Sequence, residues 1–261
     1  MIRVLVNGAL GRMGTQVVEA VQAAEGLELA GGVDLNGKKD CLQLADGSTR
    51  PLFTDLAEAL ETATPDVVVD FTRPDVVMDS MRLILKKGVR AVVGTTGFTQ
   101  DRLDEVEKLC KENNTAALIA PNFALGAVVM IKLAAEAAKY FDDVEIIEKH
   151  HDKKLDAPSG TAILTAQKIA EVRKAHKQGH PEEKETIPGS RGGDFEGMKI
   201  HSLRLPGYVA SQEVVFGSQG ETLKIISDPV SRECYMPGVV MGCRKIMERE
   251  GLVYGLDRIL D

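Results

Sequence analysis

The chain has 261 residues, which is enough for two modest domains or one large domain with a sizeable core. Hydrophobic residues make up 44% of the sequence and charged residues 27%, so disorder is excluded as the main state. The formal net charge of −7 repels polyanions, and we therefore expect no nucleic-acid partner. The four cysteines are scattered and lack zinc-site spacing, which predicts reduced thiols in a cytoplasmic protein and no bound metal.

The start of the chain and its longest uncharged stretch bear on membrane association. Met1 leads directly into the apolar run Ile2–Val6, with no pattern of a secretory signal. The uncharged stretch between Glu112 and Lys132 is long enough to raise the question of a membrane span. Pro121-Asn122 would break a helix there and leave backbone groups unpaired in lipid, so we predict no membrane association.

In its first half the chain alternates short apolar runs with helical patterns. The runs predict strands at residues 2–6, 27–33, 67–69, 91–93 and 117–119. Helices are predicted from Met13 to beyond Val21 and at residues 55–63, 75–87 and 100–112, and an irregular polar segment runs through Lys38, Lys39 and Asp46-Gly47. Strands that are apolar on both faces are typical of a parallel sheet covered by helices on both sides. We therefore predict a doubly wound α/β domain.

The pattern changes after about residue 122. Helices are predicted at residues 124–140 and 161–175, with a strand at 144–149 between them. From Lys199 to Ser227 the sequence reads as consecutive strands with turns at Pro206-Gly207 and Ser218-Gln219-Gly220, which predicts antiparallel pairing. This half is a second, α+β domain with a mixed or antiparallel sheet. The last part of the chain, residues 236–250 and 256–260, is predicted to be helical and to dock back on the first domain.

A glycine-rich turn, Gly8-Ala9-Leu10-Gly11-Arg12-Met13-Gly14, lies between the first strand and the first helix. Its glycines permit a tight turn, and the helix N-terminus offers N–H groups to a pyrophosphate. The spacing lacks the middle glycine of the commoner motif, so the loop alone is equally consistent with a plain turn. Asp34 ends the second strand, where an acidic residue would bond the ribose hydroxyls or simply cap a turn. Together the two features favour a dinucleotide site.

Two further loops follow predicted strands, Gly94-Thr95-Thr96-Gly97 and Ala120-Pro121-Asn122-Phe123. In an open α/β sheet the ligand crevice lies outside the carboxyl ends of the strands. Both loops therefore lie where a nicotinamide and its ribose would bind.

The most informative stretch of the second domain runs from Lys149 to Ala162. His150, His151, Lys153 and Lys154 create a local positive field that could hold a small carboxylate substrate. Ser159 is a candidate N-cap, and Gly160 and Thr161 would then present backbone N–H groups from a helix start. If the preceding strand continues, its period of two places His150 on the face of Val144 and Ile146 and turns His151 away, unless the strand ends there. A histidine is suited to proton transfer near neutral pH.

Five motifs in chain order resemble those of the 4-hydroxy-tetrahydrodipicolinate reductase family, also called dihydrodipicolinate reductase. They are Gly8-Ala9-Leu10-Gly11-Arg12-Met13-Gly14, Asp70-Phe71-Thr72-Arg73-Pro74, Gly94-Thr95-Thr96-Gly97, Ala120-Pro121-Asn122-Phe123, and His150-His151 followed by Asp156-Ala157-Pro158-Ser159-Gly160-Thr161-Ala162. The resemblance runs through nearly the whole chain. Its last motif is highly specific, whereas the glycine loop is not.

The resemblance implies an NAD(P)H-dependent reductase of the diaminopimelate route to lysine, acting on a small dicarboxylate. It implies that the dinucleotide is held by Gly8, Ala9, Leu10, Gly11, Arg12, Met13, Asp34, Arg73, Gly94, Thr95, Thr96, Ala120, Pro121, Asn122 and Phe123. It assigns proton transfer to His150 and Lys154, without deciding between them, and substrate contacts to His151, Ser159, Gly160, Thr161 and Thr96.

The same resemblance implies the architecture. Residues 1–122 and 232–261 would form a discontinuous, Rossmann-like dinucleotide-binding domain, and residues 123–231 a substrate-binding and oligomerisation domain. It also implies a homotetramer built on the second sheet. Adjacent apolar residues on the predicted strands agree, because they exceed what one face of a small sheet buries: Val214, Val215, Phe216, Ile225 and Ile226.

Charges near the expected ribose oppose one another. Asp34 favours NADH and repels the 2′-phosphate of NADPH, whereas Lys38, Lys39 and Arg12 offset part of that repulsion. Leu35 stands where some relatives have a basic residue. We therefore expect use of both NADH and NADPH, with NADH equal or modestly favoured.

Two other functions stay open on the residues alone. One is a Rossmann dehydrogenase of another small amino-acid or aldehyde substrate, and the other is a non-catalytic NAD(H)-binding redox sensor. The sequence has no basic DNA-reading segment, and a sensor would leave the histidine–lysine cluster without a role. Trials of candidate substrates would separate the three.

Overall fold

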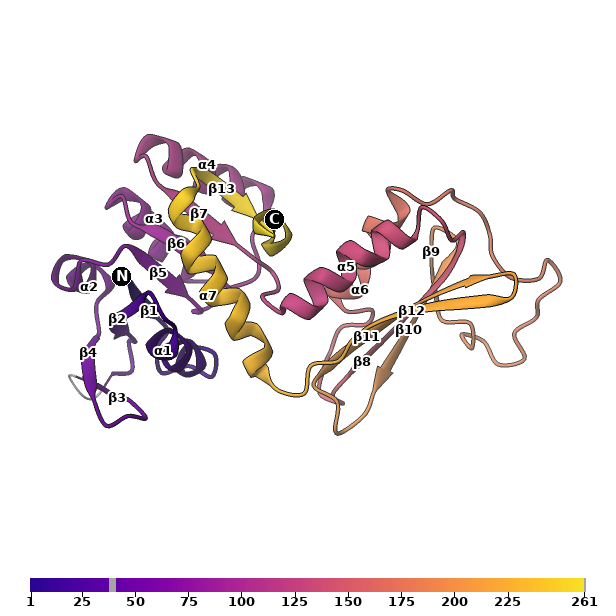
Figure 1. Cartoon of the computed structure of the whole chain (residues 1–261), viewed down its shortest axis with the longest axis horizontal. Coiled ribbons are helices and arrows are strands. Elements are labelled where there is room, and N and C mark those ends of the chain that lie inside the picture. The colour runs from indigo at the N-terminus through magenta and orange to yellow at the C-terminus, as the bar shows by residue number, and fades with distance from the viewer. Residues whose placement is uncertain (38–40, 261) are drawn as a thin grey trace. The chain divides into compact units, whose positions relative to one another are not determined.

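The chain folds into two compact units. The computed structural model describes residues 1–37 and 41–260. Unit 1 comprises Met1–Ala124 with Tyr235–Asp261, and unit 2 comprises Leu125–Cys234. Unit 2 is therefore an insertion between two passes of the chain through unit 1, as the colours of Figure 1 show.

Unit 1 is built on an eight-stranded sheet in the order β13-β7-β6-β5-β1-β2-β4-β3. All neighbours pair in parallel except β3 and β4. The strands are β1 (Ile2–Asn7), β2 (Leu27–Val33), β3 (Cys41–Gln43), β4 (Thr49–Phe53), β5 (Val67–Asp70), β6 (Arg90–Val93), β7 (Ala116–Ile119) and β13 (Gly251–Tyr254). Strands β5 and β7 are buried along their whole length, which explains why they are continuous apolar runs rather than alternating patterns.

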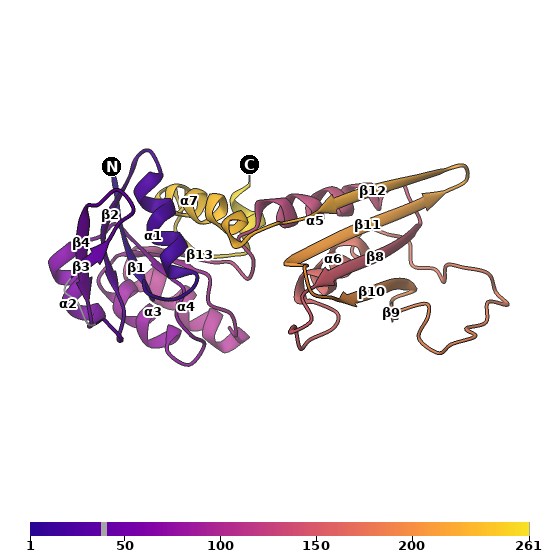
Figure 2. The ribbon, with the colours of Figure 1, turned by 90° about the horizontal axis from the view of Figure 1, so that it is seen from below.

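Helices cover both faces of this sheet. The helices are α1 (Gly14–Ala23), α2 (Leu56–Ala63), α3 (Val77–Lys86), α4 (Gln100–Glu112) and α7 (Met236–Lys245), with short 3-10 turns at Arg232–Tyr235, Ile246–Glu248 and Leu256–Ile259. Helices α1 and α7 contact each other on one face, and α2, α3 and α4 pack on the other (Figure 2). Unit 1 thus has the doubly wound, Rossmann-like arrangement that the sequence predicts.

Two parts of unit 1 differ from the sequence prediction. The segment around Asp46-Gly47, predicted to be irregular, connects β3 and β4, which pair in an antiparallel hairpin. The C-terminal segment is not helical throughout, because Gly251–Tyr254 forms β13, which pairs in parallel with β7 at the sheet edge. Strands β3, β4 and β13 are only partly buried, so they lack the continuous buried apolar run that marks the equally short β5 and β7.

Unit 2 consists of a five-stranded sheet with two helices on one face. Its strand order is β12-β11-β8-β10-β9. The elements are α5 (Leu125–Ala137), β8 (Asp143–His150), α6 (Gly160–Ala170), β9 (Gly193–Phe195), β10 (Met198–Arg204), β11 (Ala210–Ser218) and β12 (Glu221–Ser227). The core lies between the sheet and the helices and includes Ile146, Ile169 and Phe216.

The pairing within unit 2 corrects one expectation. Strands β11 and β12 form the predicted antiparallel hairpin, whose turn contains Gly220 at φ +87°. Strands β10 and β11, however, lie on opposite sides of β8, which is parallel to β10 and antiparallel to β11. The turn at Pro206-Gly207 therefore passes across the end of β8 instead of closing a hairpin. Val144 and Ile146 of β8 are almost completely buried, in agreement with its central place.

Candidate active site

The loops singled out in unit 1 meet at one edge of the sheet. Strands β1, β2, β5, β6 and β7 are parallel, so their carboxyl ends share that edge. From β1 the sheet extends to β2 on one side and to β5 on the other, which makes the gap between β1 and β5 a topological switch point. This is where ligands bind in open α/β sheets.

The glycine loop packs closely against the end of β2 and against the start of α1. Gly8 has φ +81°, and the N–H groups of Gly8 and Ala9 donate to the carbonyl of Val33 at 2.9 and 3.0 Å. A Cβ on Gly14 would lie 1.9 Å from the carbonyl oxygen of Gly8, so α1 can begin there only with glycine. Within the described residues, the start of α1 has neither a side-chain cap nor an acidic residue in its first turn. Its positive dipole end is therefore available to an anionic group.

Asp34 both holds the glycine loop and caps a turn. Its Oδ2 accepts a hydrogen bond from the N–H of Leu10 at 3.0 Å, and its Oδ1 accepts one from Asn36 at 3.0 Å. Each oxygen has a second acceptor position, so ribose hydroxyls can bind to the same carboxylate. Leu35 beside it is 80% exposed. Lys38 and Lys39, expected to oppose Asp34, lie outside the described residues.

A buried carboxylate that the sequence analysis did not assign a role joins three of the strand ends. Asp70, with no exposed surface, accepts hydrogen bonds from Asn7 Nδ2 at 2.7 Å, from Thr72 N and Oγ1 at 3.0 and 2.7 Å, and from Thr95 Oγ1 at 3.1 Å. Burial raises the pKa of Asp70, and these hydrogen bonds only partly offset that effect. The Thr95 hydroxyl therefore anchors the loop that follows β6 to the buried carboxylate of Asp70. The sequence feature that could have indicated this role is an aspartate at the end of an apolar strand.

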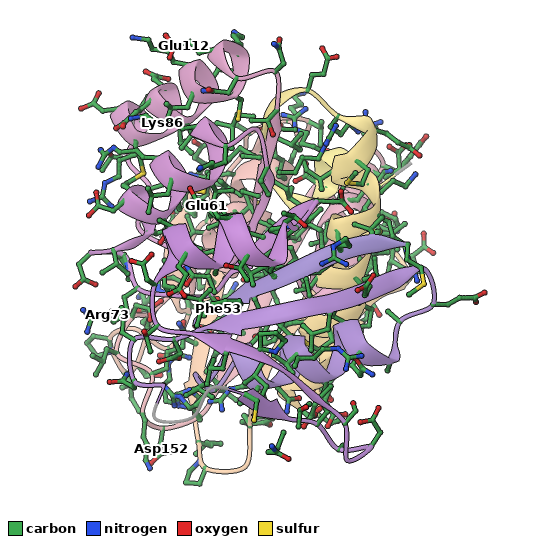
Figure 3. All side chains as sticks on the ribbon, turned by 90° about the vertical axis from the view of Figure 1, so that its left-hand side faces the viewer. Phe53, Glu61, Arg73, Lys86, Glu112 and Asp152 are labelled. Carbon is green, nitrogen blue, oxygen red and sulfur yellow. The ribbon has the colours of Figure 1, made fainter. Side chains whose placement is uncertain are left out.

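The other predicted cofactor residues differ in exposure. Figure 3 shows Arg73 at the surface, where its guanidinium pairs with Asp75 at 2.6 Å. Ala120 and Phe123 are buried, and the Phe123 ring packs on Phe71 with 5.8 Å between centroids. Those two residues can face a ligand only through backbone atoms. Thr96, in contrast, is exposed.

The functional residues of unit 2 follow β8. The strand ends at His150, so His151 begins the loop, which resolves the question of strand parity. The loop leads to Ser159, whose Oγ accepts a hydrogen bond from the N–H of Ala162 at 3.2 Å, as the N-cap prediction requires. Helix α6 then begins at Gly160, which places the N–H groups of Gly160 and Thr161 at its positive end.

Charge pairing in this loop is more balanced than the sequence suggests. Lys154 Nζ donates to Asp156 Oδ1 at 2.8 Å, and this hydrogen bond lowers the pKa of Asp156. To hold a substrate carboxylate, Lys154 must exchange this partner. The Nδ1 atom of His151 is buried and has no hydrogen-bond partner within the described residues, which makes it a candidate ligand contact.

Glu148 and Arg204 were missed by the sequence analysis. Glu148 has no exposed surface and accepts hydrogen bonds from His150 Nδ1 at 2.5 Å and from Arg204 Nη1 and Nη2 at 2.9 and 2.7 Å. Burial alone would raise the pKa of Glu148, but hydrogen bonds from His150, Arg204 and Ser202 lower it to about 2. The available signal was a glutamate at the period-two position shared by Val144 and Ile146, on the apolar face of its strand.

Across residues 1–37 and 41–260, no group of three His, Cys, Asp or Glu side chains is placed to hold a metal ion. No helix in the same part of the chain is long and apolar enough to cross a membrane.

The glycine loop on a parallel sheet, joined to a second unit with a histidine–lysine loop, defines a two-domain oxidoreductase of the Rossmann type. Residues 2–123 match the family model "Dihydrodipicolinate reductase, N-terminus", and residues 126–260 match "Dihydrodipicolinate reductase, C-terminus". The chain belongs to the dihydrodipicolinate reductase family.

Individual relatives agree over their full length. A 4-hydroxy-tetrahydrodipicolinate reductase from Halalkalibacterium halodurans is 50% identical, with 100% of both chains covered. One from Enterococcus faecalis is 49% identical over 100% of both chains. The solved structure of a dipicolinate-bound dihydrodipicolinate reductase from Paenisporosarcina sp. TG-14 is 46% identical, covers 100% of both chains and superposes with a TM-score of 0.90.

Proposed function

We propose that this protein reduces 4-hydroxy-tetrahydrodipicolinate (dihydrodipicolinate) to tetrahydrodipicolinate with NADH or NADPH, with loss of the 4-hydroxyl group as water, in the biosynthesis of diaminopimelate and lysine. The observation that carries the proposal is the end-to-end identity of about half with reductases of that name. In this assignment unit 1 binds the dinucleotide and unit 2 binds the substrate.

When bound, the nicotinamide cofactor supplies the hydride. Lys154 and the N–H groups of Gly160 and Thr161 bind and neutralise substrate carboxylates, with further contacts from His151, Ser159 and Thr96. His150 or Lys154 holds the proton that the reaction needs. The solved relative with dipicolinate, a planar ring dicarboxylate, supports a site for two carboxylates on one ring.

The proposed dinucleotide contacts lie at the edge of the unit 1 sheet where the carboxyl ends of its parallel strands meet. Backbone groups of the loops after β1, β6 and β7 line the cofactor, and Asp34 binds the ribose. Asp34 and the exposed Arg12 act in opposite directions on a 2′-phosphate, so both NADH and NADPH serve, within roughly tenfold of each other and with NADH equal or favoured. A hundredfold preference for NADPH in steady-state kcat/KM would contradict this balance.

The proposed assembly is a cytoplasmic homotetramer formed through the sheet of unit 2. Helices α5 and α6 cover one face of that sheet, and register places Val215 and Ile226 on the other. Ile226 is 55% exposed, which supports burial against a second copy. Light scattering that gives a monomer mass of 28.2 kDa at micromolar concentration would overturn the tetramer.

The decisive test of the function is an assay with purified protein. We expect oxidation of NADH that depends on freshly made product of dihydrodipicolinate synthase, with no oxidation in its absence. Oxidation that is equally fast with unrelated amino-acid aldehydes, or absent with this substrate, would refute the proposal.

A further inference from the structure

Glu148 connects three separate parts of unit 2. Besides His150 on its own strand and Arg204 on β10, its Oε1 accepts a hydrogen bond from the N–H of Ser159 at 3.2 Å. Ser159 is the N-cap of α6, whose first N–H groups belong to the proposed substrate site. One carboxylate therefore fixes both the imidazole and the start of the helix.

The contact with Glu148 determines the tautomer of His150. An ionised carboxylate only accepts hydrogen bonds, so the nitrogen 2.5 Å from it must carry a proton. His150 is therefore protonated on Nδ1. Its Nε2 is left as the atom that can gain or release a proton during a reaction.

Arg204 keeps Glu148 in the ionised state. Its two terminal nitrogens bind the two carboxylate oxygens separately, in the paired geometry that favours a charged acceptor. Register places Arg204 directly opposite His150 on the neighbouring parallel strand. The same guanidinium donates to the carbonyl of Asp156 at 2.7 Å and so also holds the loop that carries Lys154.

We propose that Glu148, held by Arg204, is a positioning residue that fixes His150 in the Nδ1–H tautomer and directs its Nε2 to the proton transfer of the reaction. The proposal rests on the proposed function only in assigning that proton transfer to His150. Glu148 itself touches neither substrate nor cofactor in this scheme. It acts through the imidazole, as a carboxylate behind a catalytic histidine does in other enzymes.

The charged groups around His150 come from three elements. Glu148 lies on β8, Arg204 lies on β10, and the Lys154–Asp156 pair lies on the loop before α6. Loss of Glu148 would leave the Nδ1–H of His150 without its acceptor and the Arg204 guanidinium without its anion.

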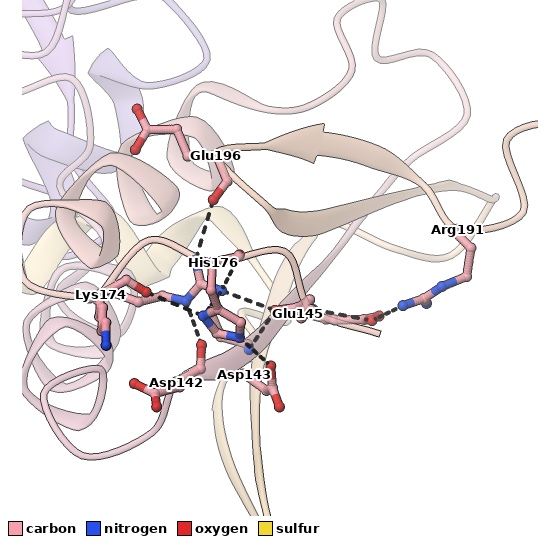
Figure 4. A network of polar contacts seen from close by, with 10 residues as sticks. Asp142, Asp143, Glu145, Lys174, His176, Arg191 and Glu196 are labelled. Carbon is pink, nitrogen blue, oxygen red and sulfur yellow. Dashed lines mark hydrogen bonds and ion pairs between the residues drawn. The ribbon is translucent and has the colours of Figure 1, made fainter. Parts of the chain in front are cut away.

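The chain provides a matched control on the same strand. Glu145 lies on the opposite face of β8 and also binds an arginine and a histidine, with Arg191 Nη2 at 2.6 Å and His201 Nε2 at 2.7 Å. Figure 4 shows the contact between Glu145 and Arg191. Glu145→Gln removes the same charge from the same strand but leaves His150 and its partners in place.

The test is ¹⁵N NMR of the full chain labelled at its five histidines, with His150→Gln used to assign the His150 signals. In the wild type we expect a proton on Nδ1 in the neutral ring. In Glu148→Gln the amide can either accept or donate, so the neutral ring of His150 should no longer be held in the Nδ1–H tautomer, and kcat should fall by roughly 10–100-fold. Glu145→Gln should leave both unchanged.

Three outcomes would overturn the proposal. They are a neutral wild-type His150 protonated on Nε2, an unchanged tautomer in Glu148→Gln, and an equal loss of kcat in a Glu145→Gln protein whose mass in light scattering equals that of the wild type. If Glu148→Gln does not fold, the wild-type tautomer still decides. Because that measurement needs no turnover, its result is independent of the substrate assay, which alone tests the proposed function.

Discussion

Unit 1 and unit 2 each contain a carboxylate with no exposed surface, and the two have opposite pKa shifts. Burial raises the pKa of Asp70, whose hydrogen-bond partners Asn7, Thr72 and Thr95 are neutral. The pKa of Glu148 falls to about 2 in spite of burial, because His150 and Arg204 bind it. The charge of the partners therefore decides whether a buried carboxylate stays ionised.

The difference suits the two proposed tasks. Unit 1 would receive a dinucleotide with a negative pyrophosphate, and a carboxyl group whose ionised form is disfavoured adds little repulsion at that edge. Unit 2 would receive a dicarboxylate, and there an ionised glutamate holds the Arg204 guanidinium and the His150 imidazole in place. Each buried acid thus fits the charge of the ligand beside it.

The largest expected effect separates these two acids by substitution. Glu148→Gln should lower the free energy of unfolding of unit 2 by about 3–5 kcal/mol, because it leaves the Arg204 charge without its partner. Asp70→Asn should change the stability of unit 1 by less than about 1 kcal/mol, since the amide oxygen keeps the acceptor for Thr72 and Thr95 and the Asn7 amide can turn over to accept from the new N–H group. Urea-dependent hydrogen exchange, followed on peptides from each unit, measures both values.

The pH dependence of stability provides a control for the expected effect of Glu148→Gln. The ordinary pKa of Glu148 is 4.5 and its folded value is about 2, so its stabilisation is complete above about pH 4.5 and is lost as the pH falls toward 2. Between pH 6 and pH 2 the stability gap between wild type and Glu148→Gln should therefore close. A gap that is independent of pH would show that packing, rather than charge, holds Glu148.

The next effect tests whether chemistry is confined to unit 2. His150→Gln and Lys154→Ala should each lower kcat by roughly 10²-fold or more, the usual scale for an acid–base group. Lys154→Ala should also raise the substrate KM, whereas dinucleotide affinity should stay the same in both. The neighbouring exposed residue serves as the control, because Lys153→Ala removes an equal charge and should change kcat less than about threefold.

Steady-state kinetics and dinucleotide titration of these variants give the result. Turnover close to wild type in both His150→Gln and Lys154→Ala would remove the assignment of acid–base chemistry to this loop.

A smaller effect compares the glycines that begin one helix in each unit. Gly14→Ala would bring a methyl group against the Gly8 carbonyl at 1.9 Å and should destabilise unit 1 by about 2–3 kcal/mol, with weaker dinucleotide binding. Gly160→Ala meets no atom of the described residues within 4 Å and should change stability by less than about 1 kcal/mol. Thermal unfolding of the two variants checks the difference, and equal losses would contradict it.

The smallest effect concerns the ribose. Asp34→Ala should shift the ratio of kcat/KM values toward NADPH by up to about tenfold, because it removes the charge that repels a 2′-phosphate. Asp34→Asn retains the acceptor for the Leu10 N–H and separates loss of charge from loss of the loop contact. A ratio that does not move in either variant would mean that Asp34 serves only its contacts with Leu10 and Asn36.

Some elements could be read from the sequence because their signals are local. Helix α4 has the predicted limits, since its thirteen residues show a full helical period between polar ends. Ser159 as an N-cap is also a local signal, one residue before its helix. The placement of β8 between β10 and β11 is not local, because neither strand records in its own residues which strand will lie beside it.

The candidate site follows the same division. His150 and Lys154 stand within one short motif and were selected from it. Arg204 lies far along the chain and reaches Glu148 only through the register of β10 on β8. Sequence reasoning without that register treats Arg204 as one more surface cation, and it leaves Glu148 without a partner.

The insertion of unit 2 has a consequence for protein engineering. A Cβ on Gly238 would lie 2.1 Å from the carbonyl oxygen of Phe123, so the chain leaves unit 1 and returns to it at adjacent points. A linker of a few residues between Ala124 and Tyr235 would therefore span the gap after excision of residues 125–234. During synthesis the same topology makes unit 1 wait for α7 and β13, which are translated only after all of unit 2.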